Sequence, residues 1–230
     1  MGKITALEVQ KRSKERVNVY IDGEFAFALT LIEAARLKKG QSLSPEEIAA
    51  LRAQDDLAKA LDSALRFIAY RPRSVQEVRR HLAAKQQPPD VIAAAVERLS
   101  AQGYLDDLAF ARFWVENRDS FKPLSPQALR QELLQKGVPR ALIDEALADI
   151  DPEDAAYRAA LTQAPRLRTT NRRDFQHKLA AFLQRRGFSF ALARTVIRRV
   201  LDTIDQQQPD RFAASAEPED EETSGGSDQE

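Results

Sequence analysis

The 230-residue sequence contains no cysteine, two histidines and only eight glycines. Without cysteine there is no disulfide framework, no thiol nucleophile and no thiolate metal site. The few glycines form neither GxGxxG nor GxxxxGK[ST], so no phosphate-binding loop is predicted. His81 and His177 stand 96 residues apart outside any HExxH motif, which favours solvated or half-buried helix residues over zinc ligands. The paired carboxylates of Asp106 and Asp107 are explained by capping of a helix start. We therefore expect no enzyme: no catalytic residue, no cofactor and no metal.

Long apolar runs are also missing. No stretch approaches the roughly 20 apolar residues that a membrane-spanning helix needs. The first 17 residues lack the apolar centre of a secretory signal. Together with 43% hydrophobic and 30% charged residues, this predicts a soluble, helix-rich, cytoplasmic protein that does not bind membranes.

The net charge of zero conceals an asymmetry between the body and the C-terminal end. Residues 1–201 hold 34 Lys and Arg against 25 Asp and Glu, a net charge of +9. Residues 202–230 hold one Arg against ten acidic residues, a net charge of −9. A basic body suits a polyanionic partner or an acidic groove on a protein. The acidic tail is predicted to be disordered, serving either solubility or electrostatic competition with nucleic acid for the basic body.

One stretch, residues 74–99, recurs along the chain. A shift of 51 residues sets Ser74, Val78 and Leu82 over Ser125, Leu129 and Leu133. A further 50 residues give a fainter third copy that includes Leu179 and Leu183. Within each copy the apolar spacing is helical, and Gly or Pro marks the central break. A fixed period near 50 residues indicates one supersecondary unit of three short helices, used three times.

The N-terminal stretch follows a different pattern. Two alternating apolar runs flank Asp22-Gly23, which is typical of a β-hairpin, and residues 4–9 are expected to add a third strand. The fold class predicted is mainly α: three tandem three-helix repeats forming an elongated curved body, with a small β-hairpin-containing module before them. The expected divisions are an N-terminal module over 1–53, three repeats over 54–105, 106–151 and 152–204, and a disordered acidic tail over 205–230. Ser44 and Ser74 are expected to cap helices.

An aromatic group stands on the first helix of the second repeat: Phe110, Phe113, Trp114 and Phe121. Such side chains could stack on unpaired bases. At helical spacing they are more often core, and we predict that they pack between the repeats.

Three motifs in order carry a family resemblance. The first is Arg71-Pro72-Arg73-Ser74-x-x-Glu77-Val78, and the second is Gly103-Tyr104-Leu105-Asp106-Asp107-x-x-Phe110. The third is Leu133-x-x-Lys136-Gly137-Val138. With the hairpin at Asp22-Gly23, they resemble the RecX family over about residues 3–204. The third copy departs from the pattern, because Asn171-Arg172-Arg173-Asp174 replaces its Ser-x-x-Glu start.

The resemblance implies a regulatory protein that binds the RecA–single-stranded DNA filament along its helical groove. There it would inhibit or modulate ATP hydrolysis, strand exchange and filament growth, with roles in DNA recombination, DNA repair and the SOS response. The partners implied are the RecA filament and, weakly and without sequence preference, single-stranded DNA. We expect a monomer.

Basic residues are the candidates for partner binding, because stacked repeats would line them along one surface. For Lys85, Lys136 and Arg186 the alternative is equally plausible: a cation in the last turn of a helix favours the helix dipole, worth about 0.3–1 kcal/mol. The full set of candidates for contact with RecA or DNA is Arg71, Arg73, Arg79, Arg80, Lys85, Arg130, Lys136, Arg172, Arg173 and Arg186.

Two other functions compete with this hypothesis. A unit of three short helices also suits a helix-turn-helix DNA-binding regulator, although no single helix concentrates the Arg, Asn and Gln needed for reading bases. A purely structural helical-repeat scaffold is the third, and the basic body argues against it only weakly.

Overall fold

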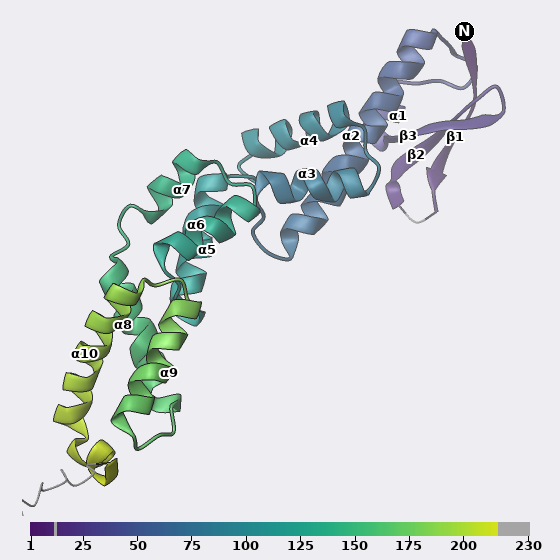
Figure 1. Cartoon of the computed structure of the whole chain (residues 1–230). Coiled ribbons are helices and arrows are strands. Elements are labelled where there is room, and N and C mark those ends of the chain that lie inside the picture. The colour runs from purple at the N-terminus through teal and green to yellow at the C-terminus, as the bar shows by residue number, and fades with distance from the viewer. Residues whose placement is uncertain (12, 216–230) are drawn as a thin grey trace, which may run out of the picture. The chain divides into compact units, whose positions relative to one another are not determined.

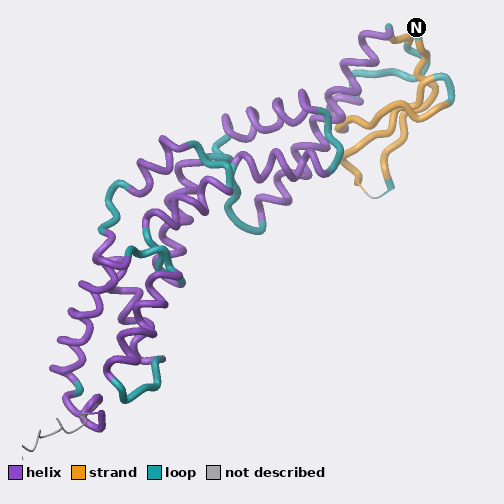
Figure 2. The backbone as a smooth tube through the Cα atoms, viewed as in Figure 1, coloured by secondary structure: helices purple, strands orange, loops and turns teal. Residues whose placement is uncertain are grey.

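The computed structural model describes residues 1–11 and 13–215. The strands are β1 Gly2–Gln10, β2 Ser13–Ile21, β3 Glu24–Thr30 and β4 Ser42–Leu43. The helices are α1 Leu31–Ala34, α2 Pro45–Ala69, α3 Val75–Ala84, α4 Pro89–Ala101, α5 Asp107–Phe121, α6 Pro126–Gln135, α7 Arg140–Leu147, α8 Pro152–Gln163, α9 Arg172–Arg185 and α10 Phe190–Gln207, with 3-10 segments η1 Ala164–Arg166 and η2 Pro209–Ser215. Within the described residues, strands occur only in the N-terminal module (Figure 2). The prediction of a mainly helical chain with a small strand-containing start is confirmed.

The chain divides into two compact units. The first comprises Met1–Phe113 with Leu134–Ile143, and the second comprises Trp114–Leu133 with the chain from Asp144 onward. The helices α5, α6 and α7 of the second repeat are thus shared between the units, and each unit is described by itself.

A four-stranded antiparallel sheet of order β3-β2-β1-β4 opens the first unit (Figure 1). The hairpin turns at Asp22 and Gly23, whose φ angles of 50° and 91° are the positive values that this tight turn requires. β1 supplies the expected third strand by pairing with β2. The inward-facing side chains of the sheet, Val19 and Phe27 among them, bury a small core with Leu43 and α1.

The helix α2 joins the sheet to the first repeat. Ser44 caps its start with Glu47 in a reciprocal capping box, as the sequence predicts. The helix then runs unbroken for 25 residues, so the expected division at residue 53 falls inside it. The reason is local: between Glu46 and Ala69 no Gly or Pro interrupts the helical pattern.

The first repeat is formed by α2, α3 and α4. Its core contains the predicted apolar stripes, including Val78 and Leu82 on α3 and Ala95 and Leu99 on α4. Small residues at Ala60 and Ala64 of α2 bring that helix close to α3 and α4. The predicted Ser74–Glu77 capping box is present at the start of α3.

In the second unit, α8, α9 and α10 form the third repeat. Four buried alanines of α8 (Ala155, Ala156, Ala159, Ala160) line one side of a core that Phe175, Leu179 and Leu183 of α9 fill. Where the sequence departs from Ser-x-x-Glu, Asn171 caps α9 by accepting a hydrogen bond from the Asp174 amide at 2.9 Å.

The end of the third repeat corrects the predicted tail. α10 continues to Gln207, and the side chain of Phe212 in η2 is buried against Phe175, with ring centroids 5.4 Å apart. Arg211 donates a hydrogen bond to the Ala164 carbonyl at 2.9 Å. Residues 205–215 are therefore part of the folded unit, because the aromatic side chain of Phe212 packs into the core of the third repeat. The rest of the predicted disordered tail, 216–230, lies outside the described residues.

The aromatic group of α5 is split by the structure. Phe110 is buried, as predicted for core. Trp114 is half-buried and donates a hydrogen bond from Nε1 to Glu132 at 2.8 Å. Phe113 is 39% exposed and Phe121 is 83% exposed, so the prediction of a core position is wrong for these two residues.

Candidate partner-binding surfaces

A largely buried carboxylate organises the joint between the first two repeats. Glu77 of α3 accepts hydrogen bonds from Arg71 Nη2 at 2.7 Å and from Lys136 Nζ at 3.1 Å, and its side chain is 13% exposed. Burial by itself raises the pKa of Glu77, but the hydrogen bonds from Arg71 and Lys136 outweigh it and lower that pKa to about 2. Arg73 lies 4.0 Å from the same carboxylate and stacks on the Phe67 ring at 3.8 Å.

The same joint fixes how the end of α6 meets the start of α3 within the first unit. Ser74 Oγ donates to the Lys136 carbonyl at 2.6 Å, and Arg80 Nη1 donates to the Gln135 carbonyl at 3.2 Å. Gly137 follows with φ of 80°, and a Cβ there would lie 2.4 Å from Gln76 Cβ. Only glycine supplies both the left-handed turn and the close approach.

Three predicted site residues therefore make stabilising contacts within the protein itself. Arg71, Arg73 and Lys136 turn their charged groups toward Glu77, so each stabilises the joint. Their contact with a partner stays a prediction. A test of partner binding should avoid them, because their removal would leave Glu77 buried without compensation.

A groove in the first unit carries the more accessible cations. Gln76, Arg79, Arg80, Ala83, Gln87, Pro89 and Ile92 line a hollow of about 330 Å³ between α3 and α4. Arg79 is exposed and makes no ion pair with any described residue. Its guanidinium is therefore available to an acidic or phosphate group from outside.

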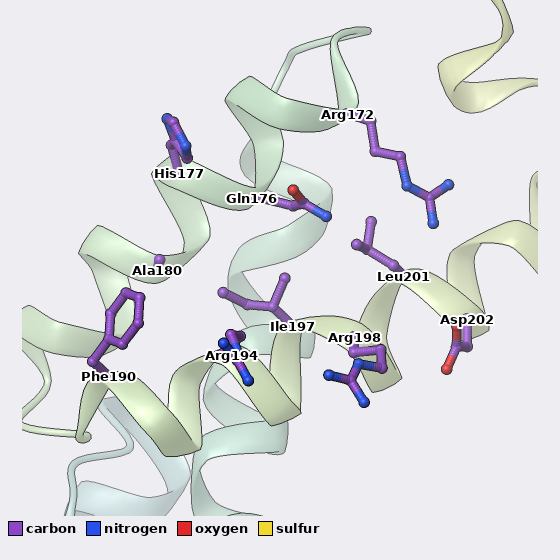
Figure 3. A pocket seen from close by; sticks show the side chains of 10 residues that line it. All are labelled: Arg172, Gln176, His177, Ala180, Phe190, Arg194, Ile197, Arg198, Leu201 and Asp202. Carbon is purple, nitrogen blue, oxygen red and sulfur yellow. The ribbon is translucent and has the colours of Figure 1, made fainter.

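A larger groove, of about 450 Å³, lies between α9 and α10 of the second unit (Figure 3). Ile197 and Leu201 are buried along its floor, while Phe190 is 65% exposed at one end. Arg194 and Arg198 project from α10 one turn apart. The groove corresponds in the repeat to the one between α3 and α4. It combines an apolar floor with a cationic rim, which suits an acidic partner surface with some apolar content.

The remaining predicted residues are scattered. Arg130 pairs with Asp144, and Arg172 makes two hydrogen bonds to Asp205 at 3.0 and 2.8 Å. Lys85 and Arg173 are exposed, at the end of α3 and the start of α9. The predicted residues are not gathered into one patch within either unit.

Sequence reasoning missed Arg194, Arg198 and Phe190. The signal was available: Arg194 and Arg198 have the i, i+4 spacing of one helix face, and Ile197 and Leu201 mark the apolar stripe beside them. Comparison of the repeats does not single out the two arginines, because the first copy has no cations at the corresponding positions of α4. Its cations lie on α3 instead, at Arg79 and Arg80.

The histidines and paired aspartates have structural positions. His81 is half-buried, stacks on Phe67 with ring centroids 4.2 Å apart and hydrogen-bonds Ser63. Burial, followed by repulsion from Lys85, lowers the pKa of His81. Asp106 caps α5 by accepting from the Leu108 and Ala109 amides. Within the described residues no three His, Asp or Glu side chains gather as metal ligands, and no helix is both long and apolar enough to cross a bilayer.

Comparison with protein-family models matches four successive segments of the chain. Residues 2–44 match the regulatory protein RecX N-terminal domain, and residues 60–99, 106–147 and 150–197 match the first, second and third RecX three-helix domains. The chain is 35% identical over 217 residues to the regulatory protein RecX of Lactobacillus delbrueckii subsp. bulgaricus, covering 90% of this chain and 78% of that one.

The chain belongs to the RecX family. The regulatory protein RecX of Bacillus subtilis is 32% identical over 213 residues, covering 90% of this chain and 79% of the relative. A crystal structure of a regulatory protein RecX superposes with a TM-score of 0.65 at 29% identity, covering 85% of this chain and 98% of that one. The resemblance seen in the sequence motifs is confirmed, and the three repeats correspond to the three RecX three-helix domains.

Proposed function

We propose that this RecX-family chain regulates the RecA recombinase by binding the RecA–single-stranded DNA filament in its helical groove. There it inhibits or modulates ATP hydrolysis, strand exchange and filament growth. The observation that carries the proposal is the match to all four RecX domains in their order along the chain. The chain acts as a non-catalytic, cytoplasmic monomer.

Two features of the described residues support this function. Both units carry a groove between the second and third helices of a repeat, and cations stand at the rim of each. A filament repeats the same surface at regular intervals, so two grooves on one chain could engage neighbouring protomers and gain avidity. Single-stranded DNA would add a weak, salt-sensitive attraction to the basic body.

The direct test is single-stranded-DNA-dependent ATP hydrolysis by the cognate RecA, titrated with this protein. Inhibition at substoichiometric ratio would indicate capping or destabilisation of filaments, and inhibition only near saturation would indicate occupancy of the groove. Absence of inhibition together with tight binding to one duplex sequence would refute the proposal in favour of a helix-turn-helix DNA-binding regulator.

Charge reversal in the grooves sharpens this test. We expect Arg79→Glu combined with Arg194→Glu and Arg198→Glu to raise the concentration for half-inhibition at least about tenfold, since each reversal replaces attraction to an acidic partner by repulsion. The matched control reverses three exposed cations of the N-terminal module and α2, Arg36→Glu with Lys39→Glu and Arg52→Glu, so that the change in net charge is the same. An equal loss in both variants would mean that only net charge matters and that the grooves are not the binding surface.

A further inference from the structure

The joint between the first two repeats has a counterpart within the second unit. A shift of 51 residues sets Ser74 over Ser125, and a shift of 50 sets Lys136 over Arg186. Where Ser74 Oγ holds the Lys136 carbonyl, the Ser125 amide donates to the Arg186 carbonyl at 3.0 Å. Gly187 repeats the role of Gly137: its φ is 86°, and a Cβ there would lie 2.6 Å from Ser125 Oγ.

The counterpart lacks the carboxylate. The residue at the place of Glu77 is Ala128, whose amide donates to Ser125 Oγ at the start of α6 but whose side chain has no oxygen. The cation at the second joint, Arg186, therefore has no equivalent of the ion pair that Lys136 makes at the first. The positive charge that Glu77 neutralises at the first joint has no such carboxylate at the second joint.

Arg186 shows the consequence. Its Nη1 atom is buried and makes no hydrogen bond to any described residue. The guanidinium lies over the Phe182 ring, 4.8 Å from its centroid. The carbonyl groups at the C-terminal end of α9 do not satisfy Nη1 either, because no carbonyl of the described residues accepts a hydrogen bond from it. A buried donor without a partner is costly, and arginine keeps its charge.

The neighbours of Arg186 add positive charge. Burial lowers the pKa of Arg186, and repulsion from Arg118, Arg166 and Arg185 lowers it further. At Arg73 of the first joint, by contrast, Glu77 opposes the same two effects. The carboxylate of Glu132 is already held by Arg118 at 2.7 Å and by Trp114 Nε1 at 2.8 Å. Arg166 and Arg185 are exposed, so an anion in solution can approach these two residues.

We propose that Arg186, with Arg118, Arg166 and Arg185, binds a phosphodiester group of single-stranded DNA, which takes the place that Glu77 fills at the first joint. Arg118 lies on α5, Arg166 on η1 and Arg185 on α9, and Arg186 directly follows the end of α9. A guanidinium presents forked donors that match two phosphate oxygens. Arg118 already pairs with Glu132, which leaves three cations of the cluster without a carboxylate among the described residues. A nucleic acid strand brings a charge with each nucleotide, whereas a single carboxylate of a protein partner would balance only one of these three.

This inference rests on the proposed function for the source of the strand, but it is tested on the free protein without RecA. The probe is a fluorescein-labelled oligothymidylate, followed by anisotropy over a series of salt concentrations. Ala128→Glu restores the missing carboxylate and should reproduce the Ser74–Glu77 arrangement at Ser125. We expect it to weaken binding about tenfold and to raise the melting temperature. Gln127→Glu adds the same charge on the adjacent exposed position of α6 and serves as the matched control.

A second variant keeps the test decisive if Ala128→Glu folds poorly. Arg186→Met removes the unpaired donor and keeps an apolar side chain over Phe182. We expect an equal or higher melting temperature, weaker binding, and a log–log salt dependence that is shallower by about 0.7 for the lost phosphate contact. A clear fall in melting temperature would show that Arg186 is satisfied in the free protein and would overturn the proposal.

Two further measurements distinguish a DNA strand from free phosphate and from a protein carboxylate as the source of the anion. If inorganic phosphate at constant ionic strength stabilises the wild-type protein but not Arg186→Met, while oligothymidylate affinity is equal in both, the site binds free phosphate and the strand proposal is wrong. If both variants retain oligothymidylate affinity but lose RecA inhibition, the anion is a protein carboxylate, and the strand proposal is again wrong while the proposed function stands. If the wild-type protein itself does not inhibit RecA, the proposed function is refuted instead.

Discussion

Replacing Asp55 by Asn is expected to destabilise the first unit by roughly 3 kcal/mol. Asp55 lies on α2 with only 2% of its surface exposed, and one of its oxygens accepts a hydrogen bond from the Ala28 amide of β3 at 3.1 Å. The carboxylate also pairs with Arg16 of β2 and with Lys59, the latter at 2.7 Å. Asn would remove the charge and turn an amide NH₂ toward these donors, leaving Arg16 without its partner.

The measurement is urea unfolding followed by circular dichroism, with hydrogen exchange of the β3 amides as a local readout. The Ala28 amide should exchange faster in Asp55→Asn, because its acceptor is weakened. Asp56→Asn is the control: Asp56 is 46% exposed on its side chain and pairs with Lys59 only at 3.5 Å. Its substitution should change the unfolding free energy by less than about 0.5 kcal/mol. Equal effects at the two positions would show that Asp55 does not hold the sheet to α2.

Replacing Glu77 by Gln is expected to have a comparable effect, and a distinctive pH dependence. The pKa of Glu77 is lowered to about 2 in the folded protein, below its ordinary value of 4.5. A depressed carboxylate pKa stabilises the fold above the unfolded pKa and loses this contribution as the pH falls toward the folded pKa. The contribution, roughly 3 kcal/mol at neutral pH, should therefore disappear between about pH 4.5 and pH 2.

Glu77→Gln retains the size of the side chain and can still complete the cap with Ser74. It leaves Arg71 and Lys136 without a carboxylate. Urea unfolding at pH 7 should show the loss, and the difference between variant and wild-type protein should shrink as the pH is lowered through this range. Glu97→Gln on the exposed face of α4 is the control, with a change below about 0.5 kcal/mol. A Glu77→Gln difference that stays constant with pH would show that the charge of Glu77 does not stabilise the joint.

A double-mutant cycle can separate the pair from its surroundings. Lys136→Met alone removes one donor from Glu77, and Arg71 still holds the carboxylate. If Lys136 and Glu77 are coupled as the 3.1 Å distance indicates, the double variant should be less destabilised than the sum of the single variants. Simple additivity would place the energetic role of Glu77 with its other partners, Arg71, Arg73 and the Ser74 amide.

The sequence by itself determined the local features of this protein. The apolar spacing of Val78, Leu82 and Leu99 was enough to place helices and their buried faces, because each side chain's face follows from its position within a turn. The caps at Ser44 and Ser74 could be read from residues three apart. The turn at Asp22-Gly23 needed only residues that tolerate positive φ. The repeat and the family motifs followed from these local signals in series.

The tertiary structure decided which charges are balanced. Glu77 and Lys136 are 59 residues apart, and no periodicity in the sequence states that they meet. Arg186 and Lys136 look equivalent in the repeat, yet one is paired and the other has a buried donor without a partner, because Ala128 stands where a carboxylate would be needed. Burial of Asp55 likewise depends on how α2 lies against β3. Helix formation depends on neighbours within four residues, whereas the free energy of a charge depends on every group that packing brings around it.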